Sequence, residues 1–349
     1  MVAAGTGCTY YPLPAGLHEP GSLPNSTGQS FRRKHIRQLN ISSPSLQSIL
    51  RKQIKSNRPL LVNGAAAHLF EDLSSWTPDA IAASGNACDS QPVVKSKARL
   101  VGYKEDFLDI AQLFRERSRA VLFKAFRFEQ LSTQGGDAPL LQREYFGKLK
   151  QENNTLLYLS SSDSESSTFN FHISNQGGVL PHSHAATLNV LLYGAKRWLL
   201  VDPQDYRGND AAMRAVERLD TFEQDRDENG VEGHGCTSSQ CWFSEEAADM
   251  LSKFNLPYYD FVQQSGEAVL LPFAFTHATV DLCRETVAVE IMGQAVTGGF
   301  RPSWAREHLD WQRRLGARPR AKRKEDQIER WRWMDVFGWM AVLVVNLVG

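Results

Sequence analysis

Three histidines are the residues of this chain best suited to chemistry. His182 and His184 are separated by one residue and follow the pair Leu180-Pro181, and His277 follows a second apolar run much later in the chain. Residues two apart in a strand point to the same side, so His182 and His184 would enter one cavity together. Imidazole is a common ligand of Fe, Zn, Cu and Ni, and three ligands on one face leave positions open for a small substrate. The spacing indicates a metal site at His182, His184 and His277.

Short β-strands are expected around these histidines. Residues 168–173 are strand-like, and residues 188–201 read as two strands joined by a tight turn at 194–197. Strand patterns resume at 267–272 and 286–292. Several short strands separated by turn residues indicate a β-sandwich or barrel, so the fold class is predicted to be mainly β.

The region before these strands mixes helices and strands. A helix is predicted over 43–55, where apolar residues recur four apart, and a buried strand with a turn is predicted over 58–64. Thr77 and Pro78 predict a helix start, with Thr77 as the N-cap and Pro78 at the first helical position. Residues 103–119 have helical spacing of apolar and charged residues.

Residues 205–255 read as an insertion between the strands. Helices are expected near 211–219 and 245–254, on either side of a loop rich in Gly, Asp and Ser. The loop holds Cys236 and Cys241, preceded by a histidine, which is a partial zinc pattern without a convincing fourth ligand. A free or disulfide-bonded loop is therefore favoured over zinc.

The C-terminal region is basic and then apolar. The basic run at 313–324 lacks a recognisable nucleic-acid-reading module, and the formal net charge is +0, so nucleic acid is not expected as a partner. The apolar stretch within 331–349 would suit a membrane contact, or a helix packed on the core or at a dimer contact. Both interpretations stay open. No cleavable signal peptide is recognisable at the start.

Several motifs accompany the histidines in a defined order along the chain. They are an Arg-Pro…Gly run at 58–64, Pro-His-Ser-His at 181–184, Asn189, Gly-Ala-Lys-Arg-Trp at 194–198, and a Gly-Glu-apolar-Pro strand at 265–272 before His277. Their order and spacing resemble those of JmjC-domain, cupin-like 2-oxoglutarate oxygenases. The H-x-H variant most resembles the branch associated with the endoplasmic reticulum.

The resemblance spans residues 36–295 and implies a double-stranded β-helix of the jelly-roll, cupin/JmjC type. It implies an oxygenase that uses Fe(II) and 2-oxoglutarate to hydroxylate a protein or small substrate. His182 and His277 would be iron ligands, Lys196 would pair with the distal carboxylate of 2-oxoglutarate, and Asn189 would hydrogen-bond this co-substrate. The resemblance also implies an endoplasmic reticulum location. The cytoplasm is the alternative because no signal peptide is visible.

Two positions depart from the family pattern. His184 stands where a carboxylate usually completes a two-histidine, one-carboxylate iron site. Val179 stands where many relatives have a Thr or Ser that helps to hold 2-oxoglutarate. Both departures argue against catalysis and leave the expected fold unchanged. The alternative is a catalytically inactive JmjC-fold interaction protein with a degenerate three-histidine site.

Four regions are expected along the chain. They are an irregular leader (1–35), an N-terminal α/β support region (36–150), the β-helix domain (151–295, with the insertion 205–255) and a basic and apolar helical tail (296–349).

Overall fold

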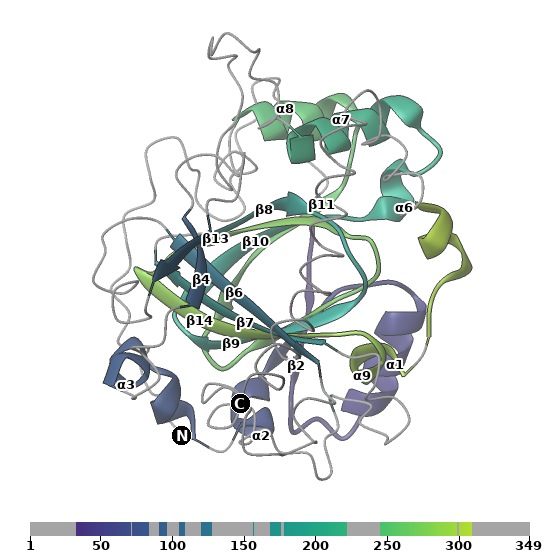
Figure 1. Cartoon of the computed structure of the whole chain (residues 1–349). Coiled ribbons are helices and arrows are strands. Elements are labelled where there is room, and N and C mark those ends of the chain that lie inside the picture. Colours follow the sequence, from purple (N-terminus) through teal and green to yellow (C-terminus); the bar gives the residue numbers. More distant parts are fainter. Residues whose placement is uncertain are drawn as a thin grey trace, which may run out of the picture. The chain divides into compact units, whose positions relative to one another are not determined.

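A computed structural model describes residues 33–70, 72–83, 91–95, 105–108, 120–127, 156, 168–175, 178–221, 245–298 and 300–308 (Figure 1). The chain divides into a larger unit, residues 1–302, and a second unit that begins at Ser303. Residues 303–308 of the second unit are helical, and the ring of Trp304 lies edge-on to that of His308. The predicted functional residues all belong to the larger unit.

Two sheets of mixed strand direction form the larger unit, which confirms the mainly β fold class. The smaller sheet has the strand order β1 (Arg33–Lys34), β11 (Tyr258–Gln264), β10 (Ala195–Val201), β13 (Thr276–Asp281) and β8 (Gly178–His182). The larger sheet has the order β2 (Arg37–Asn40), β3 (Leu60–Asn63), β12 (Ala268–Leu271), β9 (Thr187–Tyr193), β14 (Glu285–Met292), β7 (Thr168–Asn175), β6 (Ala120–Arg127), β4 (Gln91–Lys95) and β5 (Glu105–Leu108). Only the pairs β1–β11 and β2–β3 are parallel among these strands.

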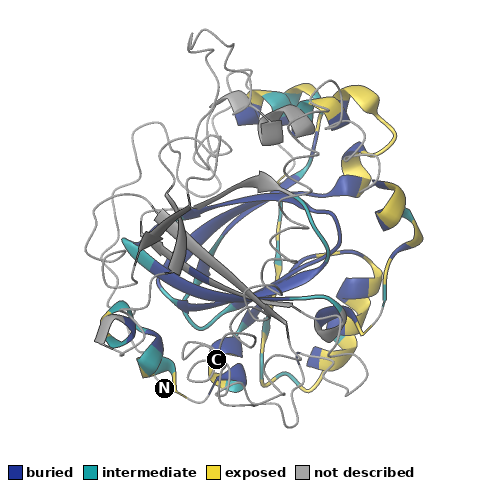
Figure 2. Ribbon diagram, viewed as in Figure 1, coloured by how far each residue is buried: buried dark blue, intermediate teal, exposed yellow. Residues whose placement is uncertain are grey.

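One apolar core joins the inner faces of the two sheets. Val269 and Leu271 of the larger sheet pack with Trp198 and Leu200 of the smaller sheet and with Phe275. All five side chains are buried, and the strands appear dark blue in Figure 2. Burying one large apolar side chain stabilises a fold by about 1.5–3 kcal/mol, so this cluster holds the sheets face to face.

A second core covers the outer face of the larger sheet. Val190 of β9 and Val289 of β14 pack there against Leu50 and Ile54 of the helix α1 (Leu46–Lys55). The helices α2 (Ala65–Leu69) and α3 (Pro78–Ala83) and the 3-10 helix η1 (Leu73–Trp76) lie on the same side (Figure 1). The predicted helix and strand of this region are confirmed. The predicted start of α3 is confirmed too, because Thr77 Oγ1 accepts a hydrogen bond from the Ala80 N–H (3.2 Å).

The insertion contributes helices beyond the smaller sheet. They are α6 (Pro203–Tyr206), α7 (Asp210–Thr221) and α8 (Glu245–Lys253), and the short helix α9 (Gln294–Thr297) follows β14. The two predicted insertion helices are confirmed. Cys236 and Cys241 lie outside the described residues, as does the predicted C-terminal stretch 313–349. No helix among the described residues is long and apolar enough to cross a membrane.

Two local predictions were wrong. Residues 105–108 form strand β5 rather than a helix, because antiparallel pairing with β4 satisfies the backbone in place of helical hydrogen bonds. The turn between β9 and β10 is confined to Gly194, so Lys196 and Arg197 are strand residues. Gly194 has a φ of 91°, and a Cβ at this position would lie 2.7 Å from the carbonyl oxygen of Glu285. Because of the positive φ and this close approach, only glycine fits at the turn.

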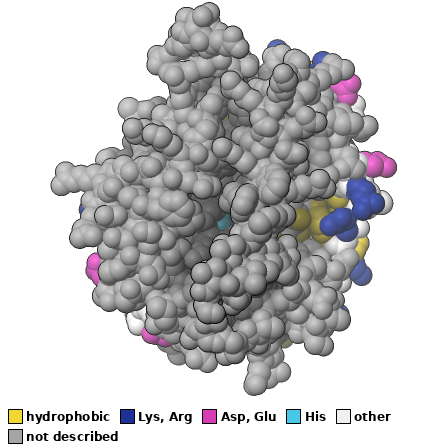
Figure 3. All heavy atoms as spheres, in the orientation of Figure 1, with side chains coloured by type: hydrophobic (Ala, Val, Ile, Leu, Met, Phe, Trp, Pro, Cys, Tyr) yellow, Lys and Arg dark blue, Asp and Glu magenta, His cyan; other side chains and the backbone are white. Residues whose placement is uncertain are grey.

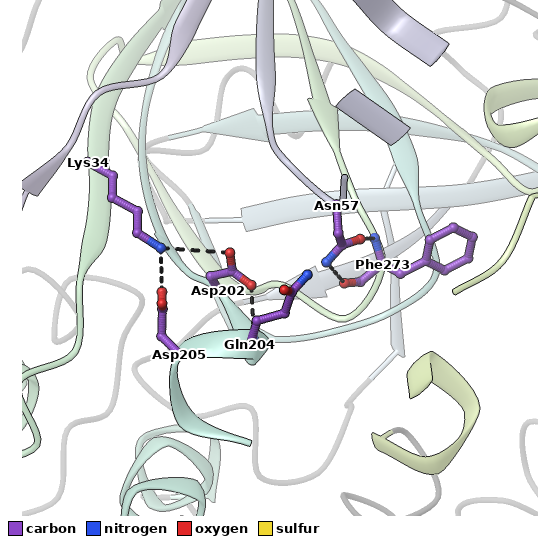
Figure 4. Close-up of polar contacts among 6 residues, drawn as sticks. All are labelled: Lys34, Asn57, Asp202, Gln204, Asp205 and Phe273. Carbon is purple, nitrogen blue, oxygen red and sulfur yellow. Dashed lines mark hydrogen bonds and ion pairs between the residues drawn. The ribbon is translucent and has the colours of Figure 1, made fainter. Parts of the chain in front are cut away.

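Polar contacts attach residues 34 and 57, near the start of the described chain, to later parts of the larger unit (Figure 4). The buried Asn57 side chain donates to the carbonyl of Phe273 (3.2 Å) and accepts from its N–H (3.1 Å). Lys34 Nζ contacts Asp205 Oδ2 at 2.5 Å and Asp202 Oδ2 at 3.8 Å. The carboxylate of Asp202 also accepts from the N–H of Gln204 and thereby caps α6.

Candidate functional site

The backbone brings the predicted histidines to one end of the smaller sheet. Strand β8 ends at His182, which is directly opposite His277 of β13. His184 lies beyond the strand, so the strand spacing from which its pairing with His182 was predicted does not extend to it, while their entry into one cavity stays a prediction. The connection at 183–186 leaves the smaller sheet to begin β9 in the larger one, and Ala274 N–H donates to the His184 carbonyl (2.9 Å). The side chain of His182 lies outside the described part of the structure.

The side chains of His184 and His277 meet at the inner face of the sheets. Their ring centroids are 4.7 Å apart in an edge-to-face arrangement, and His277 also stacks on Trp198 at 5.9 Å. His184 Nδ1 lies 2.7 Å from the Ala185 carbonyl, and His277 Nδ1 lies 2.9 Å from the Phe275 carbonyl. A carbonyl can only accept, so the Nδ1 of each ring is the donor in these two contacts.

Glu290 and His172 join this cluster, and sequence reasoning missed both roles. Glu290 Oε1 lies 3.5 Å from His184 Nε2, and Glu290 Oε2 lies 3.4 Å from His172 Nε2. Both residues are buried, and burial lowers the pKa of His172 despite the opposing effect of Glu290. The available signal was one glutamate inside the apolar strand pattern 286–292, at an inward position.

Lys196 and Asn189 line the same interior, as predicted from the resemblance. Lys196 is 3% exposed and lies opposite Asp281 in the strand pair β10–β13, with Nζ 4.0 Å from Asp281 Oδ1. Asn189 lies opposite Glu290 in the pair β9–β14. The buried atoms Asn189 Oδ1 and Thr187 Oγ1 have no hydrogen-bond partner. Such atoms usually bond an ordered water or a ligand, so this interior has polar groups for a bound molecule.

The described side chains fit part of a metal site. A ligating histidine usually donates its second ring N–H to a carbonyl or carboxylate, as His184 and His277 do through Nδ1. No three His, Cys, Asp or Glu side chains among the described residues gather in metal-holding geometry. The three-histidine prediction depends on His182, whose side chain is not among them, and it stays a prediction. Histidine side-chain atoms are visible from outside on the face drawn in Figure 3.

Cys283 forms a disulfide bond and is buried beside the end of β13. It is the one cysteine among the described residues, so its partner lies elsewhere in the chain. Structural disulfides persist mainly in oxidising compartments.

Comparison with known proteins gives no match: no family model matches the chain, and no curated protein does.

Proposed function

We propose that this chain is a JmjC-type double-stranded β-helix protein that binds Fe(II) and 2-oxoglutarate and hydroxylates a protein or small substrate. The resemblance of the motifs to that family is one support. The convergence of His184, His277, Lys196 and Asn189 on one buried interior is the observation that carries the proposal. A bound iron and 2-oxoglutarate would supply the activation of dioxygen for hydroxylation.

The residues of this chain would bind and orient the co-substrate. His182, His184 and His277 would hold the metal. Lys196, at 3% exposure, would pair with the distal carboxylate in a setting where little water competes. The Asn189 side chain, with its buried and unsatisfied Oδ1, would hydrogen-bond the same molecule through its amide group.

A second candidate is a non-catalytic JmjC-fold interaction protein. Asp281 favours it, because a fully buried carboxylate 4.0 Å from Lys196 Nζ opposes the entry of a second carboxylate. The family's usual carboxylate ligand is also replaced by His184. An interaction protein would keep the sheets and the buried interior while binding no 2-oxoglutarate.

We further propose the endoplasmic reticulum as the location, in the lumen or at the membrane. The family resemblance supports it, and the disulfide of Cys283 suits an oxidising compartment. The cytoplasm remains the alternative.

Anaerobic titration of 2-oxoglutarate into the Fe(II)-loaded full chain tests the function. A saturable visible charge-transfer band is expected, and it should be absent from His182→Ala. Metal analysis of the loaded protein and circular dichroism of both proteins are the controls. A folded, iron-loaded protein without the band would overturn the oxygenase proposal in favour of the interaction protein.

A further inference from the structure

We infer that six exposed cations near the start of the described chain form a docking face for an acidic segment of a protein partner. This partner is the substrate if the chain is the proposed hydroxylase, so the substrate role rests on the proposed function, whereas the binding of an acidic peptide does not. The cationic face consists of Arg33, Arg37, Arg51, Lys52, Lys55 and Arg58, and each of these residues is exposed.

Positive charge is concentrated in this part of the chain. Residues 33–58 contain seven Lys or Arg and no Asp or Glu, although the formal net charge of the whole chain is +0. Lys34, the seventh cation, contacts Asp202 and Asp205 and is left out of the face. None of the other six forms an ion pair with a described carboxylate. Attraction to the helix dipole accounts for the two lysines in the last turn of α1, but not for the four arginines.

The β2–α1–β3 unit brings these cations to one end. Strands β2 and β3 are parallel and α1 returns between them, so the last turn of α1 lies near the beginnings of both strands. Arg37 begins β2 directly opposite Leu60, and Arg58 is two residues before Leu60. The Arg58 N–H donates to the carbonyl of Gln53 in α1 (2.9 Å). The beginnings of the strands and the last turn of α1 therefore carry their cations together.

This end of the molecule is level with the predicted histidines. One row of cross-strand neighbours in the smaller sheet joins the two places: Lys34, Tyr259, Leu200, His277 and His182. Neighbouring strands lie about 4.8 Å apart, so the backbone at Lys34 is about 14 Å from that at His277, measured across the sheet. An extended chain rises about 3.3 Å per residue, so roughly four to five residues span this gap. An acidic segment on the cationic face would carry the next residues of its chain to the histidines.

Buried contacts fix the cationic face relative to the predicted site. Asn57, next to Arg58, donates to the carbonyl of Phe273 and accepts from its N–H (Figure 4). The following residue, Ala274, donates its N–H to the carbonyl of His184 (2.9 Å). The loop after α1 is thus joined through one short connection to a predicted site residue.

An acidic peptide fits this face better than a lipid surface does. The exposed side chains of α1 are all polar or basic: Gln47, Ser48, Arg51, Lys52 and Lys55. A helix that lies in a membrane interface inserts an apolar face into the lipid, whereas α1 packs its apolar residues into the protein core. Four of the six cations are arginines, and a guanidinium can bind a carboxylate through two parallel hydrogen bonds.

Fluorescence anisotropy of labelled peptides with the full chain at low ionic strength tests the inference. The probes are a short peptide of alternating Glu and Ser and the same peptide with Gln in place of Glu. Arg51→Glu/Lys55→Glu reverses two cations on α1. Arg214→Glu/Lys253→Glu is the matched control, with the same change of charge at exposed positions of α7 and α8; α7 packs on β8, at the edge of the smaller sheet opposite β1. The Glu peptide should bind the wild type and the control equally and the α1 variant about tenfold more weakly, and the Gln peptide should not bind.

The other outcomes decide against the face or assign it. Equal affinity in the α1 variant and the wild type, or an equal loss in the control, would overturn the inference. Tighter binding of a single-stranded oligonucleotide, or of vesicles of equal parts phosphatidylcholine and phosphatidylserine, would also overturn it. If the α1 variant fails to fold by circular dichroism, Arg51→Gln/Lys55→Gln replaces it, with about threefold weaker binding expected.

The peptide titration needs neither metal nor 2-oxoglutarate, so its result is separate from that of the charge-transfer band. Peptide binding without the band would keep the cationic face and assign it to the interaction protein. The band without peptide binding would keep the oxygenase and remove the face.

Discussion

Lys196 and Arg197 are neighbours on β10, so their cationic side chains lie on opposite faces of the strand. The two cations are paired with carboxylates in very different ways. On one side, Arg197 donates from Nε and Nη2 to the two oxygens of Asp260, at 2.8 Å each, and both side chains are fully buried. On the inner side, Lys196 Nζ stands 4.0 Å from Asp281 Oδ1. The first pair is saturated and belongs to the scaffold. The second is loose, and it leaves Lys196 available for a ligand.

Breaking the saturated pair should have the largest effect. Arg197→Met leaves the buried carboxylate of Asp260 without its partner and is expected to cost about 3–5 kcal/mol of unfolding free energy. Urea unfolding followed by circular dichroism measures it. The double variant Arg197→Met/Asp260→Leu is the control, because replacing both charges with apolar groups should recover much of the loss. A loss below about 1 kcal/mol in the single variant would remove the distinction between the two sides of β10.

The elements of the fold also divide into those that the sequence could predict and those that it could not. Apolar periodicity predicted α1, β3, β9 and β10 because burial on a known face leaves a regular pattern. The tight turn of Gly194 was predicted as well, although Lys196 and Arg197 were assigned to it. Pairing between distant strands leaves no such pattern, so residues 105–108 were read as helical when β4 holds them in a strand.

The candidate site shows the same limit. The motif order pointed to His184, His277, Lys196 and Asn189, and the structure gathers these side chains in one interior. Glu290 was missed because its contact with His184 depends on how β14 is aligned with β9, which local sequence does not encode.

Removing the charge of Asp202, which belongs to a third ion pair at the end of β10, should have the next largest effect on stability. Asp202 is poorly compensated, because Lys34 Nζ is 3.8 Å from it but 2.5 Å from Asp205. Burial raises the pKa of Asp202 to about 6 from an ordinary value of 3.8. The folded protein therefore binds more protons than the unfolded chain between these values, and stability falls as pH rises from 4 to 6.

Asp202→Asn should remove this pH dependence while keeping an acceptor for the N–H of Gln204. Relative to wild type, the variant should gain up to about 3 kcal/mol between pH 4 and pH 7. Urea unfolding of both proteins at the two pH values gives the difference. A variant that loses stability at pH 7 relative to pH 4 would mean that the attraction to Lys34 outweighs the cost of burial.

Lys196→Met tests the loose pair from the cation's side. The longer contact predicts a smaller loss of stability than in Arg197→Met, because Asp281 Oδ1 also accepts from Thr286 Oγ1 at 3.0 Å. Binding of 2-oxoglutarate to the Fe(II)-loaded protein should weaken by about 1.5–3 kcal/mol, the value of a hydrogen bond to a charged group. Isothermal titration calorimetry under anaerobic conditions measures the binding. Equal affinity in the variant and wild type would exclude Lys196 as the carboxylate-binding residue.

Asp281→Asn should have the smallest effect on stability and the most direct bearing on function. The substitution removes the negative charge beside Lys196 and keeps an acceptor for Thr286. If a carboxylate of 2-oxoglutarate binds Lys196 Nζ, it would lie within about 7 Å of Asp281, so removing that charge should strengthen binding by about 2 kcal/mol or more, or at least roughly thirtyfold, at an effective dielectric constant of 20. The same calorimetric titration measures the gain, with Glu285→Gln as a charge-matched control on β14. Tighter binding in Asp281→Asn alone would mean that Asp281 tunes a working co-substrate site. No binding in the wild type or in the folded, metal-loaded variant would mean that the loose pair on β10 marks an interior that does not take this co-substrate, and the interaction protein would then be the better account.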